Sequence, residues 1–171
     1  IYGAAGHQER NGDLYLGMNG VHIPNCPVMV AKYSSVGVPL VDWRRHVSIV
    51  RDEAKEKALC NLFGITEKSH LINRKFGTPP NTKDANLPIF TGEVVEVDIE
   101  KSCRGGFDIF DWIGPISICD KFSSVETALT YFADMYAKPT CQLNMFARRA
   151  VGEASNYFTN TPTTYRHGNW T

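Results

Sequence analysis

The stretch VEVDIEKSCRGGFDIFDWI, residues 95–113, decides the predicted fold. From Val95 to Ile99 apolar residues alternate with acidic ones, which is the period-two pattern of a half-buried strand. Residues 102–106 contain two adjacent glycines and predict a turn, after which Phe107–Ile113 reads as a partner strand. Strands joined by so short a connection pair antiparallel.

Helical patterns lie on both sides of this stretch. A helix is predicted from Asp42 to Leu62, with Asp42 as the N-cap and Gly64 as the left-handed residue that ends it. Ser123 and Glu126 form a capping-box pattern ahead of a second helix that ends before Pro139. The apolar spacing from Thr140 to Ala154 predicts a third helix.

The amino-terminal part of the chain has the character of strands. Alternation over residues 14–18, followed by Asn19-Gly20 and Val21–Ile23, predicts a β-hairpin. Short apolar runs at 28–33 and 36–41 add two further strand candidates.

Grouped rather than alternating strands and helices favour the α+β class. We therefore predict one domain over residues 1–171: a mainly antiparallel β-sheet with about three α-helices packed on one face. A loose N-terminal arm (1–12), a long loop (66–88) and an irregular tail (156–171) complete it. The predicted core residues are Trp43, Val47, Val50, Leu62, Val95, Val97, Ile99, Leu129, Phe132, Phe146, Ala150 and Val151.

Charge and hydropathy narrow the range of partners. Among 171 residues there are 18 Lys and Arg against 18 Asp and Glu, so the formal net charge is +0. Nucleic-acid binding requires a basic face to neutralise phosphates, and we expect no nucleic-acid partner. No apolar run reaches the roughly 18 residues of a membrane span.

The five cysteines show no zinc or redox spacing, because no two are separated by two residues. We expect reduced thiols, and hence a reducing intracellular environment or an assembled particle rather than secretion. The chain begins at Ile1 rather than Met, which fits a domain processed or excised from a longer precursor, or a chain with missing ends.

Two catalytic arrangements are considered as alternatives. A thiol nucleophile at Cys119 with His167 as its base has the required residue types, although Ser123 would place Cys119 a turn before the helix. Asp108 and Asp111 lie beside aromatic residues, a composition found in hydrolytic clefts and also on the wet face of a strand. No metal or cofactor motif is present, and we expect neither.

These motifs are weak, so the sequence favours a non-catalytic recognition or structural domain that acts through a protein partner or self-association. A surface domain of a viral or other multi-subunit assembly is one form of this hypothesis. The tail from Asn156 to Thr171 supports it, because its Tyr, Asn and Thr content is typical of adaptable contact surfaces. A hydrolase that uses Cys119 with His167, or Asp108 and Asp111, is the alternative.

Overall fold

The structure is a computed structural model that describes residues 7–10, 13–16, 47–76 and 82–146. In the first of its two compact units, β1 (His7–Arg10) pairs antiparallel with β2 (Asp13–Leu16). β1 therefore lies within the arm that was predicted to be loose. The predicted hairpin at Asn19-Gly20 lies outside the described residues.

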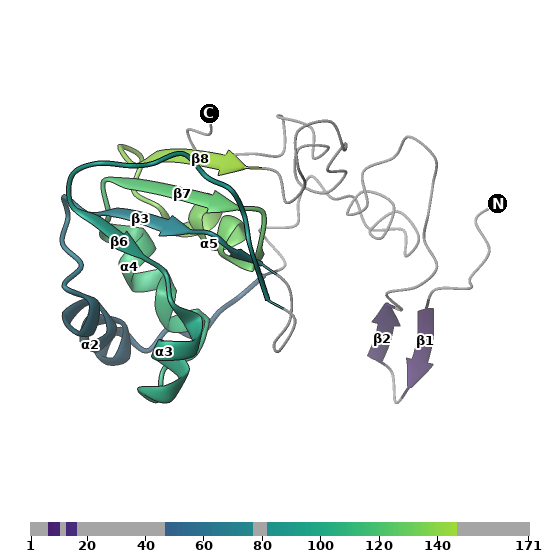
Figure 1. The fold of residues 1–171 in the computed structure, drawn as a ribbon. Helices are drawn as coiled ribbons and strands as arrows, with labels where there is room; N and C mark the ends of the chain where they lie inside the picture. The colour runs from purple at the N-terminus through teal and green to yellow at the C-terminus, as the bar shows by residue number, and fades with distance from the viewer. Residues whose placement is uncertain (1–6, 11–12, 17–46, 77–81, 147–171) are drawn as a thin grey trace. The chain divides into compact units, whose positions relative to one another are not determined.

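The second unit contains a four-stranded sheet with the order β6-β3-β7-β8 (Figure 1). The strands are β3 (His70–Asn73), β6 (Val94–Glu96), β7 (Lys121–Val125) and β8 (Gln142–Phe146). All three neighbouring pairs are parallel. The predicted α+β class with a mainly antiparallel sheet is therefore wrong, and the arrangement is α/β.

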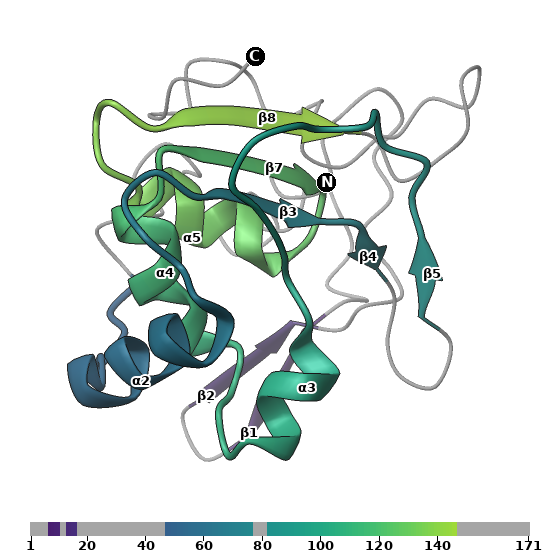
Figure 2. The ribbon, with the colours of Figure 1, turned by 60° about the vertical axis from the view of Figure 1, so that its left-hand side comes forward.

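The other elements of this unit precede the first strand or connect the strands. Helical segments are α2 (Glu53–Phe63), α3 (Ile99–Arg104), the 3-10 turn η2 (Phe110–Trp112), α4 (Ile113–Ile118) and α5 (Ala128–Tyr136). A small antiparallel pair, β4 (Lys75–Phe76) and β5 (Lys83–Asp84), follows the end of β3 (Figure 2).

The error in strand direction comes from residues 99–118, which are helical rather than extended. Asp98 ends the alternating stretch because its side chain caps α3, accepting a hydrogen bond from the Lys101 amide at 2.9 Å. Pro115 is accommodated in the first turn of α4, where a backbone N–H has no partner within the helix. With these helices between β6 and β7, the connection is long enough for the chain to return and for β7 to pair parallel with β3.

The sequence also misassigned three strand regions. β3 lies inside the predicted 66–88 loop and is only four residues long, buried at each position. Ser123 lies within β7 rather than at a helix N-cap, and α5 begins after Thr127. The predicted third helix begins instead with β8, and its remainder from residue 147 lies outside the described residues.

The prediction for α2 was partly correct. Gly64 ends the helix in the left-handed conformation, φ 65°, as expected. The N-cap is Asp52 rather than Asp42, and its carboxylate accepts from the Lys55 amide at 3.0 Å. Because the helix begins ten residues later than expected, Val50 is 97% exposed rather than buried.

The main core lies between one face of the sheet and helices α2, α4 and α5. Of the predicted core residues, Val97, Leu129 and Phe132 are buried, whereas Val50 and Leu62 are exposed. Val95 and Ile99 pack at the margin of the core. Trp43, Ala150 and Val151 lie outside the described residues. The largest fully buried side chains include Trp112, Phe122, Leu59, Leu71, Ile113, Ile116 and Leu143.

The opposite face carries a polar group that crosses the strands. Ser123 on β7 lies 2.8 Å from His70 Nε2 on β3 and accepts a hydrogen bond from the Asn144 amide on β8 at 3.0 Å. The connection from β5 to β6 passes over this face (Figures 1 and 2), and its Phe90 packs edge-on against His70 at 4.7 Å. The buried polar atoms of the face are thus paired, as buried polar groups normally are.

The described helices include none with both the length and the apolar character that crossing a bilayer requires.

Candidate ligand-binding site

The order of the strands indicates where along the sheet a ligand would bind. Counted along the chain, the order is 2-1-3-4, so the chain moves outward from β3 to β6 and then returns to β7 on the other side of β3. In open α/β sheets a ligand crevice forms outside the carboxyl ends of the strands at such a reversal. Here that point lies between the ends of β3 and β7.

A polar bridge joins these two strand ends. The Asn73 amide nitrogen, at the end of β3, donates to Ser124 Oγ at 2.9 Å and to Thr127 Oγ1 at 3.0 Å. Asn73 is only 2% exposed. Since both amide hydrogens are committed to the bridge, the capacity that remains to this side chain is its oxygen, an acceptor.

The bridge also affects the start of α5. Thr127 is the N-cap residue of α5, but its side chain makes no capping hydrogen bond to the helix. Its hydroxyl oxygen is instead engaged by Asn73. A helix start without a side-chain cap keeps first-turn N–H groups for other acceptors, and an anion is favoured there.

A cavity of about 230 Å³ lies at the carboxyl ends of β3 and β7. Most of the surface that lines it is apolar, although the lining residues include polar groups at the strand ends, one cation and one anion. The lining residues are Asn73, Lys75, Phe76, Thr82, Ile99, Glu100, Ile109, Thr127 and Leu129. Sites for drug-sized ligands span roughly 300–1,000 Å³. This cavity is therefore smaller than the usual site for a whole drug-sized ligand.

The charged side chains near the cavity differ in whether they bond to other protein groups. Arg74 is bonded to Glu96 at 2.8 Å and reaches the Leu87 carbonyl at 3.3 Å, so it stabilises the segment that covers the sheet. Lys75 and Glu100 line the cavity and are exposed. At an apolar cavity a cation can bind an anionic group of a ligand, and a carboxylate can accept hydrogen bonds from hydroxyl groups of the same ligand.

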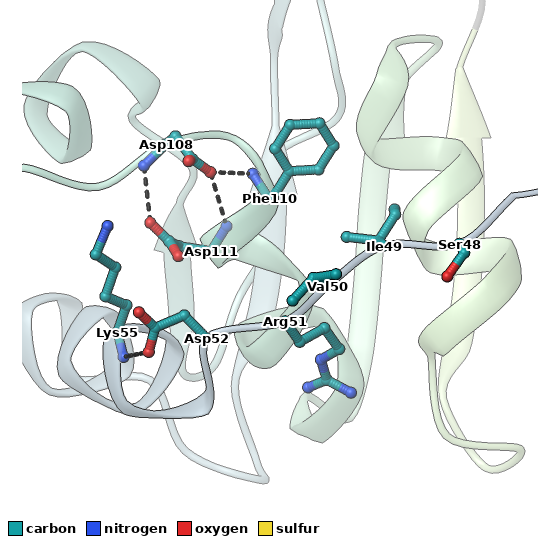
Figure 3. A pocket seen from close by; sticks show the side chains of 9 residues that line it. All are labelled: Ser48, Ile49, Val50, Arg51, Asp52, Lys55, Asp108, Phe110 and Asp111. Atoms are coloured by element: carbon teal, nitrogen blue, oxygen red, sulfur yellow. Dashed lines mark hydrogen bonds between the residues drawn. The ribbon is translucent and has the colours of Figure 1, made fainter.

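The two carboxylates predicted from the sequence are brought together at a second cavity, of about 330 Å³ (Figure 3). Asp108 Oδ1 accepts from the Phe110 amide at 2.7 Å, and Asp111 Oδ2 accepts from the Asp108 amide at 2.8 Å. Asp111 is buried. Both carboxylates thus stabilise the turn that begins η2. To act as a catalytic acid or base, either would have to give up its hydrogen bond to the backbone.

The thiol alternative is not assembled by the described residues. Cys119 is fully buried, and its sulfur lies 3.9 Å from that of Cys141. Hydrogen bonding to Cys141, followed by burial, raises the pKa of Cys119, which opposes the thiolate that a nucleophile needs. His167 lies outside the described residues.

Sequence reasoning missed the switch-point residues, because they fell in the predicted loop and in the predicted capping box. Asn73 at the end of a short apolar run was the only available signal. In the described ranges, no three His, Cys, Asp or Glu side chains gather closely enough to hold a metal ion.

Comparison of the chain with family models, with curated proteins and with solved structures gave no match. The class that the fold and the cavity define is therefore stated from the geometry: an α/β domain with a crevice at a topological switch point.

Proposed function

We propose that this chain is a ligand-binding α/β domain whose switch-point cavity takes the ring-bearing part of a nucleotide-class molecule. One observation carries the proposal: an apolar cavity lies at the carboxyl ends of β3 and β7, where the strand order reverses.

The ligand class follows from the lining. Ile99, Ile109 and Leu129 provide apolar surface for a planar ring, and Asn73 provides an acceptor at the base of the cavity. Glu100 is placed to accept hydrogen bonds from ligand hydroxyls. Lys75 supplies a cation for a phosphate that extends outward.

Calorimetric titration with adenosine monophosphate and with adenosine tests this assignment. We expect Ile109→Trp to abolish binding of both, because the larger ring fills the cavity. Ile89→Trp is the matched control, since Ile89 is 94% exposed and does not line the cavity. Circular dichroism of both variants establishes that the fold is retained.

The charge assignment has a separate test. Lys75→Glu should weaken binding of adenosine monophosphate while leaving adenosine unchanged, because only the former has a phosphate. Lys83→Glu, on β5 and outside the lining, should change neither. Absence of binding by both probes at millimolar concentration, or equal binding by Ile109→Trp, contradicts the proposed function.

Protein recognition or self-association is the second candidate. It is favoured by the exposure of Val50, at 97%, and of Phe110, at 49%, which both line the second cavity (Figure 3). Light scattering over a range of concentrations tests self-association. A monomer whose mass does not rise with concentration would leave only a foreign protein as the partner.

A further inference from the structure

Cys119 and Cys141 occupy equivalent places at the amino ends of two neighbouring parallel strands. Cys119 ends α4 and comes two residues before β7, while Cys141 comes directly before β8. The pairing of the strands continues toward them, since the Gln142 amide donates to the Asp120 carbonyl at 2.9 Å. The pair therefore lies at the end of the sheet opposite to the cavity.

The strand register sets the separation of the two backbones. Lys121 pairs with Gln142, so Cys119 and Cys141 are offset by one residue across the two strands. With strands about 4.8 Å apart and a rise of about 3.3 Å per residue, the α-carbons are expected roughly 5.8 Å apart. Disulfides have α-carbon separations of about 4.4–6.8 Å, most often near this value.

The side chains already face each other. Their sulfurs are 3.9 Å apart, and both residues are at most 1% exposed. The Cys119 sulfur also lies 3.4 Å from the Ile116 carbonyl oxygen. The register thus leads us to expect the backbone spacing of a disulfide, and bond formation requires the sulfurs to approach by roughly 2 Å.

We propose that Cys119 and Cys141 form a reversible intramolecular disulfide by exchange with a small-molecule disulfide such as oxidised glutathione. Cys141 is the first to react: hydrogen bonding from Cys119 lowers its pKa, and it follows the exposed residues Pro139 and Thr140. Local opening of this turn gives the reagent access.

The exchange takes place in two steps. The Cys141 thiolate attacks one sulfur of oxidised glutathione, forming a mixed disulfide and releasing one glutathione thiolate. Cys119 then loses its proton and attacks the Cys141 sulfur, which releases the second glutathione. The protein dithiol is oxidised by two electrons, and the glutathione disulfide is reduced to two thiols. This inference is independent of the proposed function.

The experiment uses the full chain with Cys26, Cys60 and Cys103 replaced by serine, so that only the buried pair remains. After incubation of the folded protein with oxidised glutathione, we expect a mass about 2 Da below that of the reduced chain and no adduct. Peptide mapping without reductant should show one linked peptide pair containing Cys119 and Cys141. Dithiothreitol should restore the original mass.

Thermal unfolding gives a second readout. The bond closes a loop that includes β7 and α5, so the oxidised form should unfold roughly 5–10 °C higher than the reduced form. Adding Cys119→Ser to this variant should trap a glutathione adduct on Cys141.

Three results would each overturn the proposal: thiols that stay unmodified, a stable adduct in the presence of both cysteines, or a lower unfolding temperature after oxidation. Wild-type protein gives the same peptide-mapping readout if the serine variant does not fold.

Discussion

Replacement of Gly114 by alanine tests how closely α2 and α4 pack. A β-carbon at this position would lie 2.4 Å from Glu56 Cβ, 3.1 Å from Glu56 Cγ and 2.9 Å from Glu56 Oε2. Carbon atoms in contact are normally about 3.5–4.0 Å apart. The first contact is decisive, because the Cβ of Glu56 is fixed to the backbone of α2 and no rotamer change removes it. The two helices must therefore separate by about 1 Å.

The magnitude follows from two opposed effects. Alanine is better than glycine in a helix by up to about 1 kcal/mol. Overpacking of this kind lowers the free energy of unfolding by about 1–3 kcal/mol. The carboxylate of Glu56 also accepts from Arg51 Nε at 2.8 Å, so displacement of the side chain disturbs an ion pair whose carboxylate is buried and whose guanidinium is partly exposed. We therefore expect a net loss of roughly 1–2 kcal/mol or more.

Urea denaturation monitored by fluorescence measures this loss, with the fully buried Trp112 as a probe. Gly105→Ala is the control, since its φ of −82° is ordinary and the nearest neighbours of its β-carbon would be the Phe107 ring, at 3.2 Å, and the Ser102 carbonyl, at 3.3 Å. In a Glu56→Gly background the loss caused by Gly114→Ala should shrink by about 1 kcal/mol. Equal or higher stability of Gly114→Ala in the wild-type background would refute the packing argument.

Three further substitutions test the core and the polar groups of the sheet. Phe132→Ala should lower the free energy of unfolding by about 3–5 kcal/mol, because the ring is buried, and a loss below about 1 kcal/mol in urea would contradict that burial. Asn73→Ala should lower it by about 1–3 kcal/mol, because two hydroxyls lose their donor, and an unchanged urea midpoint would argue against the bridge. Burial, with a contribution from Lys121, lowers the pKa of His70, so as the pH falls the unfolded chain takes up a proton at His70 before the folded chain does. The stability contributed by neutral His70 is present above about pH 6.5 and is lost as the pH falls below it, so His70→Gln should flatten stability measured between about pH 7 and 5.

Local signals predicted several parts of the fold correctly. Gly64 ends α2, and the buried face of α5 contains Leu129 and Phe132 as expected. Strand direction was not predictable from the same signals, because it depends on whether residues 99–118 are extended or helical. The apolar residues among them fit an extended chain as well as short helices, and the capping bond of Asp98 favours the helix at 99–104 only in the folded chain.

The candidate site was even less accessible from the sequence. Asp108 and Asp111 do lie together, as their spacing of three implies, but they are tied to the backbone of one turn. Asn73 and Thr127 are 54 positions apart, and their contact exists only because β3 and β7 are adjacent and parallel. A site at a strand-order reversal is a property of topology, which no local pattern reports.

The two serines of β7 show how this topology is satisfied. A central parallel strand is covered on both faces and is normally a continuous apolar run, yet Ser123 and Ser124 are both fully buried. The two hydroxyls lie on opposite faces of the sheet. Ser123 hydrogen-bonds with His70 and Asn144. Ser124 accepts from Asn73 and donates to the Val125 carbonyl at 2.6 Å. Fully paired buried hydroxyls contribute little net stability but disfavour a shifted register, in which they would lose their partners. The same two residues that hid the strand from sequence analysis therefore help to fix its register, and with it the position of Thr127 beside the cavity.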